Sequence, residues 1–123
     1  MVQGDEMHSR CARIISGAAK SAKRFVTSDY ILDETATLLK ARGHGRLIDP
    51  FFNAVLTSQA LRIEWMDPER FDETRRLLLK HHDQGWSFTD CFSFHLMHVL
   101  HMRDVLTKDV HFRQAGFNPL LIN

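Results

Sequence analysis

Three acidic residues, Glu34, Asp90 and Asp109, have the type and the placement to form a reactive site. Glu34 and Asp90 each share one face of a predicted helix with hydrophobic residues at helical spacing. A carboxylate on such a face is costly to bury unless a charged or polar group meets it. Asp109 follows the short candidate strand 105–107. Because sites in open parallel α/β sheets gather beyond the carboxyl ends of strands, we expect the three acids to converge at one edge of a sheet.

A cluster of carboxylates repels itself unless a cation neutralises it. Oxygen ligands suit Mg²⁺ or Mn²⁺, which a few carboxylates hold while waters complete the coordination. Such an ion polarises a phosphate and generates a hydroxide nucleophile, so phosphodiester hydrolysis would need no activated serine or cysteine. The predicted metal ligands are therefore Asp90, Asp109 and Glu34.

Each acid also has a structural interpretation. Asp90 is predicted in the first turn of a helix, where an acid interacts favourably with the helix dipole. Glu34 could lie at the border of its apolar stripe and reach water. Asp109 could be a turn or N-cap residue of the short helix that follows. The occurrence of all three acids in this order around candidate strands is therefore what indicates a site.

Other side chains allow different chemistry. Cys91, His95, His98 and Met102 fall on one face of a predicted helix, but a zinc site would need a second cluster with clear ligand spacing, and none is obvious. Partly buried, hydrogen-bonded histidines are the simpler interpretation. Basic residues form three groups that could hold RNA phosphates or be solvated surface: Lys20, Lys23 and Arg24; Lys40, Arg42 and Arg46; and Arg75, Arg76 and Lys80.

Alternating helices and strands must position these side chains. Helical periodicity predicts helices over residues 5–23, 29–42, 46–57, 68–82, 88–100 and 109–115. The expected N-caps include Ser28, Asp67 with Pro68 after it, and Ser87 in a capping box with Asp90, and Gly43 is the expected end of the second helix. Short apolar or alternating segments predict strands over residues 25–27, 61–65, 105–107 and 119–122. This alternation indicates an α/β fold with a mostly parallel central sheet flanked by helices.

Length and composition fit one globular domain over residues 1–123, with 44% hydrophobic and 25% charged residues. The net charge of +1 provides no overall basic field, so any binding of nucleic acid must come from local patches. The chain has two cysteines far apart and no apolar signal region. It also has no apolar run near the roughly 18 residues that cross a bilayer. We therefore expect a soluble cytoplasmic protein with no membrane contact.

Three segments resemble the PIN-domain family, and within it the VapC-type toxin ribonucleases. Residues 27–35, TSDYILDET, resemble the segment around the family's second acid, which would be Glu34. Residues 87–91, SFTDC, resemble the third-acid motif, with the acid at Asp90. Residues 106–112, LTKDVHF, resemble the last motif, with the acid at Asp109 and a polar neighbour at Thr107. The resemblance implies that Glu34, Asp90, Asp109 and Thr107 are the catalytic residues.

The resemblance has one departure, at the N-terminus. Family members begin with a central strand that ends in an Asp, and their parallel sheet is ordered 3-2-1-4-5. Here the first residues look like the loop and helix that follow that strand, and Asp5 does not replace its acid. We expect a PIN-like three-layer sandwich in which the first central strand and the first acidic ligand are missing. The gap would be closed by direct pairing of neighbours, by another chain, or by residues upstream of a start site assigned too late.

The resemblance implies a Mg²⁺- or Mn²⁺-dependent endoribonuclease of a toxin–antitoxin system, which hydrolyses RNA, forms homodimers and is captured by an antitoxin protein. In this hypothesis Asp90 and Asp109 hold the metal, and Glu34 completes the cluster or positions the attacking water. Thr107 assists by hydrogen bonding. The alternative is a catalytically impaired remnant that acts as an antitoxin-binding or dimerisation module. A phosphate-sensing domain built around Asp109 fits less well, because receiver-type domains need paired acids after an early strand.

Overall fold

Helices and strands alternate along the chain, as the sequence predicts. The structure, a computed structural model, describes residues 24–120. Their elements are β1 (Phe25–Ser28), α2 (Asp29–Ala41), η2 (Gly45–Leu47), α3 (Ile48–Thr57), β2 (Leu61–Glu64), α4 (Pro68–Lys80), α5 (Phe88–Val99), β3 (Asp104–Val105), α6 (Val110–Gln114) and β4 (Asn118–Pro119). The helix predicted over residues 5–23, the expected absence of a first strand and residues 121–122 of the last strand lie outside the described residues. No helix within residues 24–120 has the length and apolarity that crossing a membrane requires.

The strands form two parallel pairs, β1 with β2 and β3 with β4. Parallel neighbours need a crossover connection, which α2 and α3 supply for the first pair and α6 supplies for the second. Within the described residues no ladder joins the two pairs, so the single central sheet that we expected is seen as two separate parts. The strand predicted over 105–107 is β3 at residues 104–105 instead, because Thr107 turns away to accept a hydrogen bond from the backbone N–H of Asp109.

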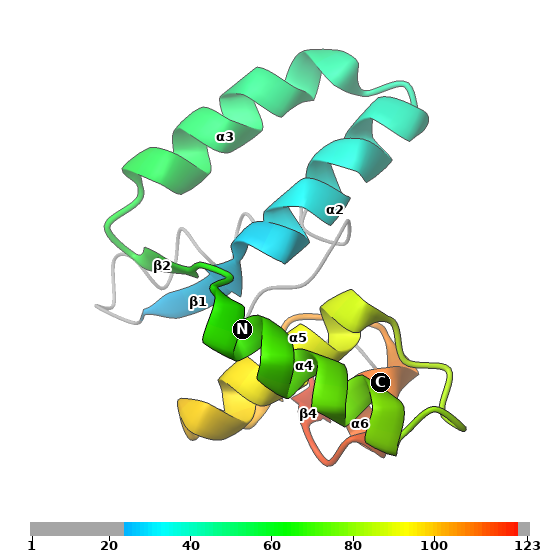
Figure 1. The fold of residues 1–123 in the computed structure, drawn as a ribbon. Helices are drawn as coiled ribbons and strands as arrows, with labels where there is room; N and C mark the ends of the chain where they lie inside the picture. The colour runs from blue at the N-terminus through cyan, green and yellow to red at the C-terminus, as the bar shows by residue number, and fades with distance from the viewer. Residues whose placement is uncertain (1–23, 121–123) are drawn as a thin grey trace.

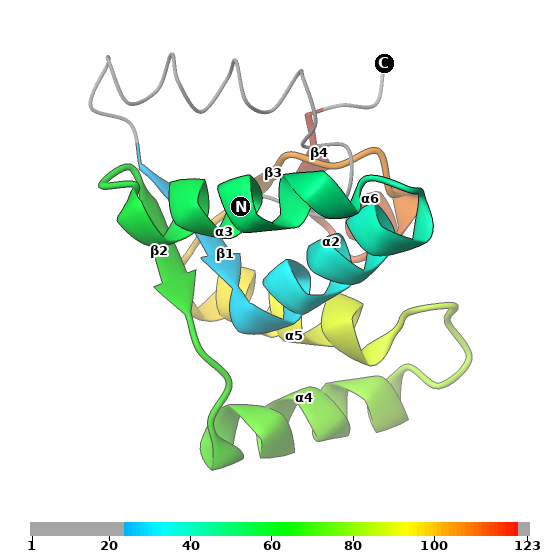
Figure 2. The same ribbon diagram turned by 90° about the horizontal axis from the view of Figure 1, so that it is seen from above.

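The helices are arranged in layers around α5. Figure 1 shows α2 and α3 side by side above β1 and β2, with α4, α5, α6 and β4 at the opposite end of the molecule. After a rotation of 90°, α5 lies between α4 and α2 (Figure 2). Seven residues of α5 are buried, including Asp90 near its N-terminus. The helix that carries one of the predicted acids is therefore the central helix of the fold.

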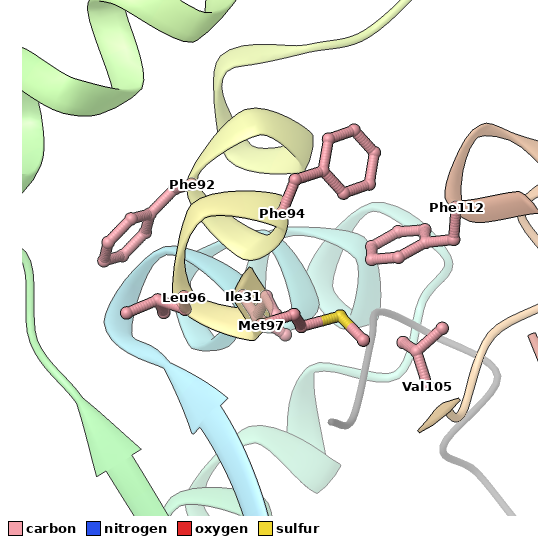
Figure 3. Packing of buried hydrophobic residues seen from close by; sticks show 7 residues of the cluster. All are labelled: Ile31, Phe92, Phe94, Leu96, Met97, Val105 and Phe112. Atoms are coloured by element: carbon pink, nitrogen blue, oxygen red, sulfur yellow. The ribbon is translucent and has the colours of Figure 1, made fainter. Parts of the chain in front are cut away.

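The buried core connects α5 to the elements that carry the other acids. Phe94 of α5 and Phe112 of α6 pack edge to face, with ring centroids 4.8 Å apart. Figure 3 shows this pair beside residues from α2 and β3. The cluster consists of Ile31, Phe92, Phe94, Leu96, Met97, Val105 and Phe112. Its packing fixes α2, α5 and α6 relative to one another.

Side-chain caps set where the helices begin. Ser28 ends β1 and caps α2, since its Oγ accepts a hydrogen bond of 3.2 Å from the backbone N–H of Ile31. Gly43 follows α2 with φ at 77°, a conformation that favours glycine. Asp67 caps α4, with Pro in the first turn as predicted. This helix ends at Lys80 rather than at residue 82, because the backbone of His81 has already left helical geometry.

Replacing Phe92 by Ala should lower the free energy of unfolding by about 3–5 kcal/mol, because this fully buried ring would leave a cavity in the core. Urea denaturation followed by circular dichroism measures the change. Leu79→Ala is the matched control, at a position of α4 that is 58% exposed, and should alter the same free energy by less than about 0.5 kcal/mol. Equal losses for the two variants would contradict the packing described here.

Candidate active site

The carboxylate of Asp90 caps α5 and also contacts His111 of α6. Its Oδ2 accepts a hydrogen bond of 3.0 Å from the backbone N–H of Ser87, whose Oγ accepts one of 3.0 Å from the backbone N–H of Asp90. This reciprocal capping box is the one that the sequence predicts. The same Oδ2 lies 3.3 Å from Nδ1 of His111. Helix capping therefore does not compete with a role in a site, because it holds the carboxylate in one orientation.

Asp109 is held in the same manner at the start of α6. Its Oδ1 accepts a hydrogen bond of 2.9 Å from the backbone N–H of His111, so the predicted N-cap role is observed. Its own backbone N–H donates to Oγ1 of Thr107 at 3.0 Å, and Thr107 is only 1% exposed. Thr107 thus contacts the backbone of Asp109 and fixes the turn that presents its carboxylate.

His111 connects the two acids. Its Nδ1 lies 3.3 Å from Oδ2 of Asp90 and 3.3 Å from Oδ1 of Asp109. Ligand atoms of these three residues all lie within 4.8 Å of one another. The contact with Asp90 is a hydrogen bond, and because an ionised carboxylate only accepts, the tautomer with the hydrogen on Nδ1 is the one that fits it. A Cβ added to Gly85 would stand 3.4 Å from Nε2, so the loop before α5 lies beside the opposite side of the ring.

Glu34 lies on α2 and faces the same region. Burial is the largest cause of the raised pKa of its carboxyl, and the negative charges of Asp90, Asp109 and Asp33 raise this pKa further, in that order. Such repulsion requires that Asp90 and Asp109 lie near Glu34. The structure therefore brings together all three acids that the sequence singles out, and we call Glu34, Asp90 and Asp109 the acidic cluster.

The local sequence pattern did not single out His111 as a member of this site. Its position two residues after Asp109 was a weak signal, because a histidine there can pair with its own N-cap acid. The contact with Asp90, which is 21 residues away, could not be read from local spacing. It exists because Phe94 and Phe112 pack the start of α6 against α5.

Glu64 is a second buried acid that the strand pattern placed on a polar face. It is 5% exposed, and its carboxylate lies 2.9 Å from Nη2 of Arg70 and 2.6 Å from Nε of Arg62. Two guanidinium groups neutralise this charge, so Glu64 has its cation built into the protein. In the acidic cluster, by contrast, Asp90 and Asp109 share the imidazole of His111 as a basic partner within residues 24–120.

The cysteine and histidines of α5 do not form a zinc site. Cys91 is fully buried, and burial, with a smaller effect of the Asp90 charge, raises the pKa of its thiol to about 11. A thiol must lose its proton to bind zinc, so Cys91 is poorly suited as a ligand. Among residues 24–120, the group able to hold a metal contains two residues of the acidic cluster and His111, but neither His95 nor His98.

The acidic cluster fits a hard divalent cation. The hydrogen bonds that described residues make to Asp90 use Oδ2, and the contacts made to Asp109 use Oδ1. The second oxygen of each carboxylate remains as a potential ligand. Oxygen ligands with a high local negative charge suit Mg²⁺ or Mn²⁺.

Comparison with known proteins identifies the family of this chain. Residues 1–118 match the family model described as PIN domain. The chain belongs to the PIN-domain family. It is 29% identical over 115 residues to the 23S rRNA-specific endonuclease VapC20 of two Mycobacterium tuberculosis strains, which covers 93% of this chain and 84% of the relative.

The fold of this PIN domain is also similar to a solved structure. The crystal structure of Mycobacterium tuberculosis VapC20, a sarcin–ricin loop cleaving toxin, matches with a TM-score of 0.74 and 25% identity over 94% of each chain. The predicted family and the PIN-like α/β fold class are therefore confirmed.

Replacing Glu34 by Gln should stabilise the metal-free protein at neutral pH. The raised pKa means that the folded state holds the Glu34 proton more tightly than the unfolded state does. Stability therefore falls as pH rises from the unfolded pKa through the folded one, and the Gln variant escapes this loss. Urea denaturation in EDTA, at a series of pH values from about 4, near the ordinary pKa of a carboxyl, to neutrality, measures the difference in the free energy of unfolding.

The advantage of Glu34→Gln should disappear near the acid end of that range, where Glu34 is protonated in both states. Saturating Mg²⁺ should reduce it at neutral pH by neutralising the acidic cluster. Asp83→Asn, in an exposed turn, is the control and should give no comparable pH-dependent gain. A Gln variant that is less stable than the wild type throughout would contradict the repulsion.

Thr107→Val should remove the acceptor for the backbone N–H of Asp109 while keeping the shape of the side chain. We expect a loss of about 1 kcal/mol in the free energy of unfolding, together with weaker Mn²⁺ binding in isothermal titration calorimetry. Thr107→Ser retains the hydroxyl and should restore Mn²⁺ binding. If Ser and Val behave alike, the hydrogen bond does not position Asp109.

Proposed function

We propose that this PIN domain is a metal-dependent endoribonuclease of a toxin–antitoxin system. The observation that carries the proposal is the convergence of Asp90 and Asp109, from the starts of two different helices, beside a Glu34 carboxyl whose pKa both of them raise. The similarity to VapC20, an endonuclease specific for 23S rRNA, supports RNA as the substrate class. The cleaved bond would be an RNA phosphodiester.

Asp90 and Asp109 would hold Mg²⁺ or Mn²⁺, and Glu34 would complete the acidic cluster. When bound, such an ion supplies charge neutralisation at the scissile phosphate and a more acidic water. The chain provides the rest. Its capping box and the Thr107 hydroxyl fix the two ligand carboxylates. Glu34 lies near both, so its carboxylate would be placed to orient the attacking water and accept its proton.

His111 acts as a positioning residue in this proposal. The N–H of its Nδ1 lies between the two ligand carboxylates and offsets part of their repulsion before a cation binds. Because His111 acts through Asp90 and Asp109, its loss should disturb metal binding first.

The proposal includes an antitoxin protein and a second copy of the chain as partners in the cytoplasm. Exposed hydrophobic side chains support it, since a protein surface would cover them favourably. Trp65 is 56% exposed and Phe71 is 47% exposed, near the start of α4, and Leu56 on α3 is 61% exposed. The same surfaces suit the alternative, an inactive remnant that only binds partners.

Asp90→Asn should reduce Mg²⁺- or Mn²⁺-dependent cleavage of purified ribosomal RNA by at least about 100-fold, because even outer-shell changes at metal sites cost 10–100-fold. Asn can still accept from the Ser87 N–H, so the helix cap and the fold should survive. Gel analysis of RNA fragments, with EDTA as the metal-free reference, measures the effect.

Asp49→Asn, at an exposed position in the first turn of α3, is the matched control and should cleave like the wild type. Cleavage that persists in EDTA, or survives in Asp90→Asn, would contradict the metal mechanism. Absence of cleavage at every Mg²⁺ and Mn²⁺ concentration, with intact partner binding, would support the remnant instead.

A further inference from the structure

A cavity of about 600 Å³ lies between α4, α5 and the residues that follow α6. Ligand pockets commonly have volumes of roughly 300–1,000 Å³. Two residues that line the cavity lie close in the chain to residues of the site. Phe94, which lines it, follows Asp90 by one turn on the same face of α5. Trp86, which also lines it, directly follows the Gly85 that packs against His111.

Aromatic rings form one wall of this cavity. Trp86 packs edge to face on Phe94 with centroids 5.0 Å apart, and Phe117 stacks on Phe94 at 5.7 Å. Phe94 is 4% exposed and contacts both other rings, whereas Trp86 and Phe117 are only partly buried. Partly exposed aromatic faces are the surfaces on which single-stranded nucleic acids stack their bases.

The Trp86 ring is held by packing rather than by a hydrogen bond. Its Nε1 is buried and has no acceptor among the described residues. Because this N–H is buried, the ring offers the cavity aromatic surface for stacking rather than a hydrogen-bond donor.

Cations line the other side of the cavity. Arg76 and Lys80 lie one turn apart on α4, and both are exposed. Glu73 also lines the cavity, and Nε of Arg76 pairs with Asp72 at 3.0 Å. Lys80 therefore offers the more accessible charge for an anion, and a phosphate is the anion that accompanies a base.

Histidines of α5 add hydrogen-bonding groups. Burial is the main cause of the lowered pKa of His95, and a neutral imidazole offers one donor and one acceptor. His98 lies one turn nearer the C-terminus and is exposed. A cavity lined by aromatic rings, cations and imidazoles is better matched to a nucleotide than to an aliphatic side chain of a protein partner.

We propose that this cavity binds one nucleobase of single-stranded RNA beside the phosphodiester to be cleaved, with the base against Trp86 and Phe117 and a flanking phosphate near Lys80. This rests on the proposed function, because RNA is the substrate only in that proposal. A base held here would set which phosphodiester reaches the acidic cluster, since α5 connects the two sites rigidly.

The test uses RNA binding rather than cleavage. The chain has two tryptophans, so Trp65→Phe leaves Trp86 as the only indole fluorophore. In the full chain carrying Trp65→Phe and Asp90→Asn, a short single-stranded oligoadenylate should quench the fluorescence of Trp86. An abasic oligonucleotide with the same sugar–phosphate backbone should leave it unchanged, because it has no ring to stack.

Affinity should follow the same pattern in fluorescence anisotropy. Trp86→Leu, in the Asp90→Asn background, should weaken binding of the oligoadenylate by about 5- to 100-fold, which corresponds to the loss of one stacked base. Binding of the abasic oligonucleotide should not change. Trp65→Leu removes an exposed indole outside the cavity and is the matched control, with unchanged affinity for both oligonucleotides.

A variant of an exposed residue provides a second test that does not depend on the folding of Trp86→Leu. In Lys80→Gln, the slope of the logarithm of oligoadenylate affinity against the logarithm of salt concentration should fall by the equivalent of about one phosphate contact. In Lys40→Gln, on α2, this slope should not change. Unchanged affinity in a folded Trp86→Leu, or an equal loss for abasic RNA, would overturn the proposal, as would a Lys80→Gln variant with the wild-type salt dependence. Loss of antitoxin binding alone would assign the cavity to the protein partner.

The two proposals can fail separately. Base-dependent quenching of Trp86 without any metal-dependent cleavage would support the cavity and contradict the nuclease. Metal-dependent cleavage with no base-dependent quenching would support the nuclease and contradict the cavity.

Discussion

Electrostatic repulsion between Asp90 and Asp109 is the constraint on which the site depends. Two carboxylates with ligand atoms this close are unfavourable unless positive charge or hydrogen-bond donors compensate them. The protein supplies donors for one oxygen of each, from backbone N–H groups and from the Nδ1–H of His111. Burial, and to a smaller extent the negative charges of Asp90 and Asp109, raise the pKa of the nearby Glu34 carboxyl. Glu64, which has two arginine partners, shows how the same chain neutralises an acid that has only a structural role.

The folding of the backbone and the construction of the site use the same interactions. Asp90 and Asp109 are helix-capping residues, so the orientation of each carboxylate is determined as soon as its helix forms. The aromatic contact between Phe94 and Phe112 then sets the separation of the two helix starts. A structural interpretation and a functional interpretation of the same acid are therefore compatible, and the presence of a cap is no argument against a metal ligand.

The cavity beside the acidic cluster extends this arrangement along α5. Successive turns of the helix carry Asp90 and Phe94, so a ligand in the cavity and a phosphate at the acidic cluster would be held by one rigid element. The central position of α5 between α2 and α4 limits its movement (Figure 2). Binding of a base and positioning of the scissile bond would thus be coupled through geometry, without a conformational change.

The sequence by itself determined the alternation of helices and strands, the caps at Ser28, Asp67 and Ser87, and the three acids, because these signals are local in spacing and residue type. It also provided the family resemblance. Only the tertiary structure decided that His111 reaches Asp90, that Glu64 is buried between arginines, and that Trp86, Phe117 and Lys80 line one cavity. The division of the described strands into two pairs was likewise not predicted. These features depend on side chains far apart in the sequence, and their contacts arise from packing around α5 rather than from any local pattern.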